Sequence, residues 1–152
     1  MILRENNFDK IRQTVKKLKQ EKKQIILILS DDALVRKVLE HEKEITLVPE
    51  LKFRKDKLYQ RNSGFNEVLA TLAHKNKITL GILLNEIISS KPIEKDRVLG
   101  RVRQNIELCK KKKVGVKWVA ETPKFERTKQ ELLALGLAMG MNTKMAKEVA
   151  KN

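Results

Sequence analysis

The sequence predicts an α/β protein with one mainly parallel sheet and crossover helices, because two kinds of apolar pattern alternate along its 152 residues. In one pattern apolar residues recur every three or four positions, which is typical of a helix with one buried face. In the other, short runs of consecutive positions are apolar, which is typical of parallel strands covered on both faces. A closed eight-stranded barrel usually needs about 250 residues. We therefore expect one domain, residues 1–152, with fewer strands.

Continuous apolar runs predict four strands, at residues 25–29, 45–48, 78–84 and 114–120. Pro49 stops the second run, because proline lacks the N–H that a strand ladder needs. Two more short strands are candidates, one at residues 1–3 and one around Leu58 and Tyr59 in the irregular segment 51–61.

Apolar stripes predict helices at residues 8–18, 34–39, 63–72, 94–112, 122–135 and 142–149. Ser63 stands where it can cap the third helix. Thr122 followed by Pro123 suits the start of the fifth helix, and Gly136 or Gly140 can end it.

The charge balance points to a polyanionic partner. The chain has 34 Lys and Arg against 19 Asp and Glu, a formal net charge of +15. Nucleic acid is favoured, because neutralised phosphates release condensed counterions. A membrane is not expected, since no apolar run approaches the roughly 20 residues of a spanning helix and no signal-peptide pattern is visible. The single cysteine, Cys109, excludes an internal disulfide and suits a cytoplasmic protein.

Few residues suit catalysis or metal binding. His41 and His74 come late in predicted helices, where a histidine favours the helix dipole, and Cys109 falls on an inner stripe. Asp31 and Asp32 follow a strand, but they also begin a helix, where carboxylates cap backbone amides. The sequence has no glycine-rich phosphate loop. We therefore expect no catalytic residue, no metal ligand and no cofactor bound by the protein.

One basic segment covers residues 91–117, where ten Lys and Arg accompany three acidic residues. Arg97 and Arg101 lie four residues apart on the predicted helix, so we expect them to share a face and bind phosphate. Replacing either by alanine should weaken RNA binding and its salt dependence without unfolding the protein. Further candidates for RNA contact on this helix are Arg103, Gln104, Asn105, Lys110 and Lys111. The lysine run serves equally well to complement the helix dipole.

A second basic segment leads into the third predicted helix. Its candidate RNA-binding residues are Arg54, Lys55, Lys57, Arg61, Asn62, Ser63 and Asn66. Free N–H groups at a helix start can bind a phosphate, and Gly64 permits close approach of the backbone. The alternative is structural: Ser63 caps the helix and Asn66 completes its first turn. The residues alone leave both interpretations open.

Aromatic residues make up only 4% of the chain, so a platform that stacks successive single-stranded bases is not expected. We expect recognition by backbone shape and charge more than by base identity.

Two motifs resemble ribonuclease P protein component 3, a family of archaeal proteins that includes the thirty-kilodalton subunit of the eukaryotic enzyme. Residues 61–73, Arg-Asn-Ser-Gly-Phe-Asn-Glu-Val-Leu-Ala-Thr-Leu-Ala, are similar to its R-x-S-G-[apolar]-N-x-V-L-A-x-L-A segment. Residues 97–116 are similar to its basic helix and following strand. The positions that match these motifs are Arg61, Ser63, Gly64, Asn66, Arg97, Arg101, Arg103 and Asn105.

This resemblance implies a TIM-like (β/α) barrel, here reduced or incompletely closed, with mainly parallel strands and outer helices. It implies a non-catalytic subunit that organises the RNA of ribonuclease P, an endoribonuclease whose RNA uses Mg²⁺ to remove 5′ leaders from precursor tRNA. The implied partners are that RNA, a small RRM-like subunit with two copies of each protein, and precursor tRNA indirectly. Two alternatives remain: a small barrel enzyme holding a phosphorylated substrate at Arg61, and a ribosomal or RNA-assembly protein.

Overall fold

The computed structural model describes residues 1–151, and Asn152 lies outside the described residues. Five strands form one sheet in the order β1-β2-β3-β4-β5, and every neighbouring pair is parallel. The strands are β1 (Ile2–Arg4), β2 (Ile26–Leu29), β3 (Thr46–Pro49), β4 (Thr79–Leu83) and β5 (Val116–Val119). The predicted parallel sheet is therefore confirmed, and the candidate strand at the N-terminus is its edge.

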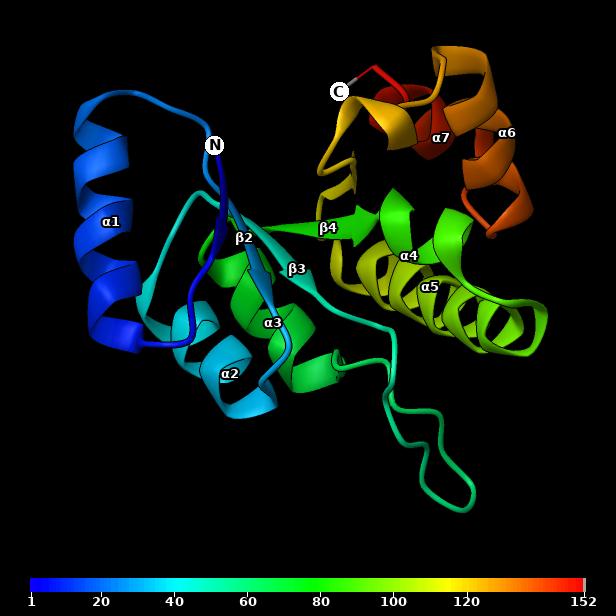
Figure 1. Ribbon diagram of the computed structural model, residues 1–152, viewed down its shortest axis with the longest axis horizontal. Helices are drawn as coiled ribbons and strands as arrows, with labels where there is room; N and C mark the ends of the chain where they lie inside the picture. The colour runs from blue at the N-terminus through cyan, green and yellow to red at the C-terminus, as the bar shows by residue number, and fades with distance from the viewer. Residues whose placement is uncertain (152) are drawn as a thin grey trace.

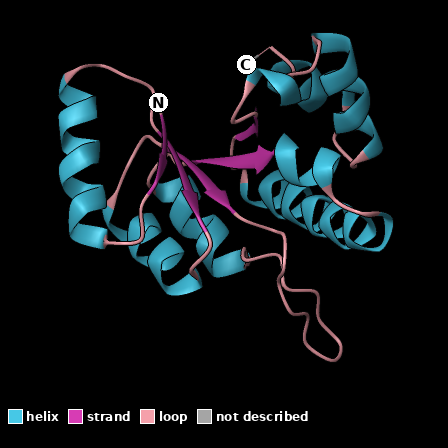
Figure 2. Cartoon of the chain, viewed as in Figure 1, coloured by secondary structure: helices cyan, strands magenta, loops and turns pink. Residues whose placement is uncertain are grey.

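Helices connect the strands as crossovers (Figures 1 and 2). They are α1 (Phe8–Gln20), α2 (Asp32–His41), α3 (Glu67–Lys75), α4 (Leu84–Ser89), α5 (Pro92–Lys112), α6 (Lys129–Ala138) and α7 (Thr143–Val149), with a 3₁₀ turn at Pro123–Phe125. Figure 1 shows α1 to α3 beside the first strands, α4 and α5 beyond β4, and α6 and α7 together near the C-terminus.

Side-chain caps set the starts of five helices. In each, a side-chain oxygen accepts the backbone N–H three residues later, as in the usual N-cap geometry. The capping residues are Asn7, Asp31, Asn66, Thr128 and Asn142. The capping role expected of Asp31 is confirmed.

Three local predictions are wrong. Ser63 does not cap α3, because its hydroxyl donates to the Phe65 carbonyl at 2.9 Å and Asn66 is the cap. The Thr122–Pro123 pair starts only a 3₁₀ turn, because α6 has its own capping box at Thr128. The strand predicted around Leu58 and Tyr59 is the tip of a tight turn, closed by an isolated antiparallel bridge between residues 57 and 60.

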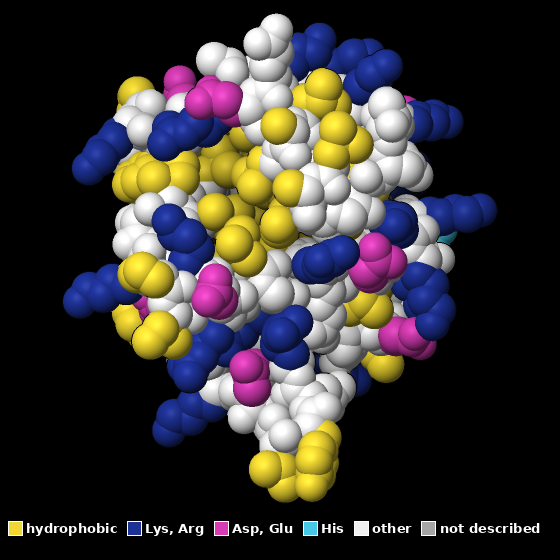
Figure 3. Space-filling model, turned by 90° about the vertical axis from the view of Figure 1, so that its right-hand side faces the viewer, with side chains coloured by type: hydrophobic (Ala, Val, Ile, Leu, Met, Phe, Trp, Pro, Cys, Tyr) yellow, Lys and Arg dark blue, Asp and Glu magenta, His cyan; other side chains and the backbone are white. Residues whose placement is uncertain are grey.

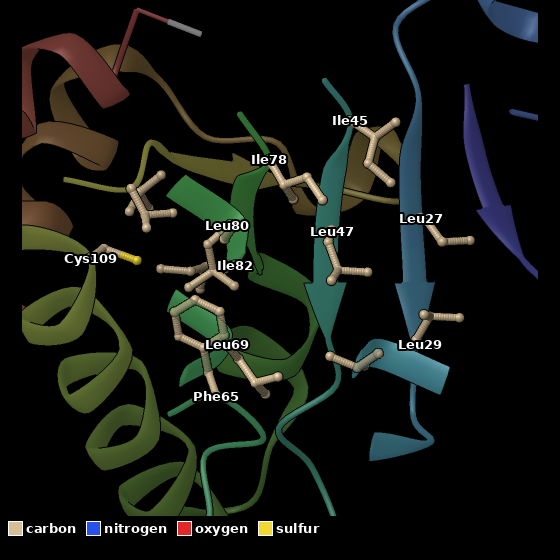
Figure 4. Close-up of a cluster of buried hydrophobic side chains, with 14 of the residues drawn as sticks. Leu27, Leu29, Ile45, Leu47, Phe65, Leu69, Ile78, Leu80, Ile82 and Cys109 are labelled. Atoms are coloured by element: carbon tan, nitrogen blue, oxygen red, sulfur yellow. The ribbon is translucent and has the colours of Figure 1, made fainter. Parts of the chain in front are cut away.

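The main core lies between the sheet and the helices. Alternate strand residues such as Leu27, Leu47, Leu80 and Ile82 point to the helices, and Cys109 meets them from α5 (Figure 4). A smaller cluster, Ile28, Val48, Leu83 and Val119, fills the opposite face of the sheet. Burial on both faces explains why the strands are apolar at consecutive positions.

The sheet curls so that side chains from its two edges come into contact. In the described part of the chain β1 and β5 are the edges and have no ladder between them. The Arg4 guanidinium at the end of β1 nevertheless donates to the carboxylate of Glu121, just after β5, at 2.7 Å. Near the other end of the strands, the Lys117 ammonium donates to the Gln24 side chain at 2.9 Å. Side chains therefore bridge a gap that a complete barrel would fill with further strands.

Candidate nucleic-acid interface

An open cleft of about 610 Å³ lies between the start of α3, helix α2, helix α5 and the loop that precedes α3. Its basic lining residues are Arg36 of α2 and Lys57 and Arg61 of the loop, and Gln104 contributes from α5. The cleft therefore brings the second basic segment next to the basic helix. Arg36 was missed from the sequence, although its position four residues after Asp32 places both on one face of α2.

Arg101 of α5 binds the loop that precedes α3 through hydrogen bonds of its side chain. Its guanidinium donates to the carbonyls of Leu51 and Arg54, both at 2.8 Å, and to the Asp56 carboxylate at 3.1 Å. Only 2% of the Arg101 side chain is exposed. The predicted shared surface of Arg97 and Arg101 is therefore wrong: Arg97 is exposed, whereas Arg101 turns inward to bind carbonyls that need donors.

The loop is also tied to itself through Asp56 and Asn62. The Asp56 carboxylate accepts the backbone N–H of Asn62 at 2.7 Å. This hydrogen bond, with a smaller contribution from Arg101, lowers the pKa of Asp56. The Asn62 side chain accepts the N–H of Gly64 at 3.1 Å and donates to the Lys55 carbonyl at 3.3 Å. Asn62 therefore shapes the loop, and its amide is not free for a phosphate.

The two sequence motifs meet where the loop crosses α5. The buried Asn105 side chain donates to the Ser63 carbonyl, and the Gln104 side chain donates to the Arg61 carbonyl, both at 3.4 Å. Gly100 lets the Arg61 guanidinium lie against the helix, because a Cβ at this position would stand 2.7 Å from the Arg61 Cζ atom. Segments about 40 residues apart in the sequence therefore form one surface.

Arg54 and Gly64 form an internal contact. The Arg54 side chain is 7% exposed and pairs with the Asp32 carboxylate at 2.7 Å. Gly64 has φ +68° and lies so close that a Cβ there would stand 2.4 Å from the Arg54 Cζ atom. The close approach expected of Gly64 is thus made to a guanidinium.

Side chains of the protein itself occupy part of the space at the start of α3. Asn66 takes the Leu69 N–H at 2.9 Å, and the exposed Glu67 carboxylate pairs with Lys111 and lies 4.0 Å from Lys112. The hydrogen bond from Lys111 lowers the pKa of Glu67, so this carboxylate is ionised at neutral pH. A phosphate bound at the helix start would face that charge. The geometry here favours structural roles for Ser63 and Asn66, although Asn66, and not Ser63, caps the helix.

The candidate residues thus divide into two groups. The buried or occupied ones, which cannot present their side chains freely to RNA, are Arg54, Asn62, Ser63, Asn66, Arg101 and Asn105. The exposed cations are Lys55, Lys57, Arg61, Arg97, Arg103, Lys110 and Lys111, and Gln104 is half-buried beside them. Two of these cations already have partners on the surface, since Lys110 pairs with Glu107 and Lys111 pairs with Glu67.

The two histidines lie beside backbone carbonyls, and the cysteine is buried in the core. His41 Nδ1 lies 2.8 Å from the Lys37 carbonyl, and His74 Nδ1 lies 3.1 Å from the Lys113 carbonyl. Burial raises the pKa of the Cys109 thiol to about 12, so it is not a reactive thiolate at neutral pH. Within residues 1–151, no group of three or more His, Cys, Asp or Glu could hold a metal ion. Over the same residues, no helix is long and apolar enough to cross a membrane.

A second cleft, of about 520 Å³, lies at the carboxyl ends of the strands and was missed from the sequence. Arg4 binds both Glu50, at 2.6 Å, and Glu121, whose other oxygen accepts from Asn85 at 3.0 Å. Burial raises the pKa of Glu86, whose carboxylate accepts the backbone N–H groups of residues 51 and 52. Each of these polar residues follows a strand end closely, which is the signal that could have located them.

The sequence is similar to archaeal proteins of one kind. Ribonuclease P protein component 3 of Methanosarcina acetivorans is 27% identical over 146 residues, which cover 95% of this chain and 58% of that protein. The protein of the same name from Methanococcus vannielii is 30% identical over 107 residues, covering 70% of this chain and 43% of that protein. This chain therefore spans roughly half of the length of the curated relatives it matches. No family model matches it.

Solved structures share the fold. A chain in a cryo-EM structure of archaeal ribonuclease P with mature tRNA has a TM-score of 0.80 at 20% identity, covering 99% of this chain and 63% of that one. A prolidase in complex with N-methylphosphonate-L-proline has a TM-score of 0.60 at 11% identity, covering 97% and 38%. The predicted reduced, incompletely closed α/β barrel is confirmed. The resemblance predicted from the two motifs is confirmed as well: this chain is similar to archaeal ribonuclease P protein component 3.

Proposed function

We propose that this chain is a non-catalytic protein subunit of ribonuclease P, which binds and organises the catalytic RNA for removal of 5′ leaders from precursor tRNA. The observation that carries the proposal is the joining of two basic motifs into one surface, in which the exposed Arg61 and Arg103 line a further cleft of about 600 Å³ along α5. A surface of fixed cations neutralises RNA phosphates and thereby allows negatively charged RNA helices to approach one another.

The partners proposed with this function are the ribonuclease P RNA, a small RRM-like protein subunit with two copies of each protein, and precursor tRNA indirectly. The Mg²⁺ requirement belongs to the RNA, and the protein itself is proposed to bind no cofactor. Its place of action is the cytoplasm, where the RNA is processed. Support comes from the similarity to component 3 and from the net charge of +15.

Reconstitution tests the proposal. Precursor-tRNA cleavage by the cognate ribonuclease P RNA and RRM-like subunit is measured with and without this protein, at limiting Mg²⁺. We expect the protein to lower the Mg²⁺ requirement or to speed cleavage. If it binds neither component and leaves cleavage unchanged, the proposal is wrong.

A paired variant locates the RNA surface. Arg61→Ala with Arg103→Ala should weaken RNA binding and reduce the slope of log affinity against log salt by about 1.4 to 1.8, because two phosphate contacts are lost. Lys16→Ala, which removes an exposed cation from α1, is the matched control and should change affinity little. Equal effects of the double variant and the control would place the RNA elsewhere.

The cleft at the strand ends is the observation that favours the alternative function, a small barrel enzyme. It occupies the position where barrel enzymes bind substrates, and a prolidase shares the fold. Three of its charged residues pair with one another, however, since Arg4 binds both Glu50 and Glu121. Turnover of phosphorylated small molecules by the isolated protein, lost in Arg4→Gln, would support the enzyme; its absence alongside active reconstitution would support the RNA-binding subunit.

A further inference from the structure

The loop between β3 and α3 projects from the body of the protein and carries apolar side chains at its tip. Leu58 is 87% exposed and Tyr59 is 96% exposed, the highest values among the large hydrophobic side chains in residues 1–151. The loop extends downward in Figure 1, and Figure 3 shows apolar side chains at the lowest point of the molecule, with no other segment covering them. Side chains exposed to this extent contribute little to the stability of the fold, so burial in the core does not account for apolar residues at the tip.

The tip is held in position. Backbone hydrogen bonds join Lys57 and Gln60 in both directions, at 2.9 and 3.3 Å, so Leu58 and Tyr59 occupy the two central positions of a closed turn. The base of the loop is fixed by Arg101, through Asp56 and the carbonyls of residues 51 and 54. A ring presented by a fixed turn loses little conformational freedom on binding.

The surroundings of the tip are cationic. Lys55, Lys57 and Arg61 flank it and are all exposed. The acidic residue nearest the tip, Asp56, binds Arg101 and the Asn62 N–H, so its carboxylate is directed away from the tip. The tip therefore combines an exposed aromatic ring with neighbouring positive charges, a combination complementary to a nucleobase with its adjacent phosphates. A hydrophobic protein surface would match the ring but not these cations.

We propose that Tyr59 stacks on an unpaired RNA base while Lys55, Lys57 and Arg61 hold the neighbouring phosphates. This rests on the proposed RNA-binding function and adds a specific element to it, a bulged or looped-out nucleotide. The low aromatic content excludes a platform for successive bases, but one projecting ring is enough for one base. Leu58 covers the edge of the stacked base.

The test compares two RNA hairpins of identical stem sequence, one fully paired and one with a single bulged 2-aminopurine. Binding is measured by anisotropy, and stacking by quenching of the 2-aminopurine fluorescence. The variants are Tyr59→Ala, Tyr59→Phe, which keeps the ring, and Leu137→Ala, which shortens another exposed apolar side chain, on α6. Because the Tyr59 side chain is almost fully exposed, its replacement removes no buried contact and should not unfold the protein; circular dichroism checks this.

We expect the wild type to prefer the bulged hairpin by about tenfold, the contribution typical of one stacked base. Tyr59→Ala should lose that preference and the quenching, whereas Tyr59→Phe and Leu137→Ala should keep both. An equal affinity of the wild type for both hairpins, with strong salt dependence, would overturn the stacking role and leave the proposed function standing. Absence of binding to either hairpin, together with inactive reconstitution, would overturn both. Unchanged RNA preference in Tyr59→Ala with weaker binding of the RRM-like subunit would instead assign the tip to a protein contact.

Discussion

The guanidinium of Arg101 lies 3.1 Å from the carboxylate of Asp56 and fastens the projecting loop to α5. The arginine is buried and the aspartate is partly exposed, so the pair joins the inside of the protein to its basic surface. Its role is therefore to position the exposed cations of the loop, and several measurable consequences follow from this arrangement and from its neighbours.

Arg101→Ala should destabilise the protein, contrary to what its place in the sequence suggested. The substitution removes three hydrogen bonds and leaves the carbonyls of Leu51 and Arg54 without their donor, a loss of about 3 kcal/mol. Arg97→Ala, on the exposed side of the helix, should change the free energy of unfolding by less than about 0.5 kcal/mol and reduce only RNA affinity. Urea denaturation of both variants measures the difference, and similar midpoints would contradict the inward role of Arg101.

The Asp56 carboxyl should titrate below its ordinary value of 3.8 in the folded protein. The folded-state pKa is lowered chiefly by the Asn62 N–H and then by Arg101. The carboxylate therefore contributes its full stabilisation at pH values above the ordinary pKa. The contribution is lost as the pH falls through the lowered pKa. Carboxyl-carbon NMR in the folded protein and in urea gives both values. Asp56→Asn should remove this part of the acid sensitivity, and an equal pKa in the two states would refute the contact.

Gly100→Ala should separate stability from RNA affinity. Alanine favours a helix interior over glycine by about 1 kcal/mol, so the free energy of unfolding should hold or rise. The new Cβ would stand 2.7 Å from the Arg61 Cζ atom and displace that exposed, flexible side chain. RNA affinity should therefore fall severalfold, as for one lost phosphate contact. In an Arg61→Ala background the same change should have no further effect, and an additive loss would show that Gly100 acts in another way.

Cys109 should be unreactive in the folded protein. Its thiol is buried in the core, and burial raises its pKa to about 12. A chromogenic disulfide reagent at pH 8 should label less than stoichiometrically over hours in buffer and fully within minutes in guanidinium chloride. Rapid labelling of the native protein would mean that α5 opens from the sheet.

The sequence by itself determined the class of fold and the sign of the net charge. Runs such as Ile26–Leu29 are apolar at consecutive positions because both faces of the sheet are covered, and this pattern is local. The stripe of Val98, Val102, Ile106 and Cys109 identified the inner side of α5 for the same reason. The excess of positive charge depends only on the composition of the chain, and the two motifs depend only on the local order of residues. These features were predicted correctly because neighbours in the chain carry them.

Only the tertiary structure decided which polar residues reach the surface. Arg101 and Asn105 border the apolar stripe of α5, and helical spacing cannot tell whether such residues face water or the loop laid across them. They turn inward because the loop brings carbonyls that need donors, and the residues in contact are 42 to 50 positions apart in the sequence. The bridging of the sheet edges by Arg4 and Glu121 is of the same kind, since the curl of all five strands places the two residues together. Contacts between distant segments depend on the packing of the whole chain, which no local pattern contains.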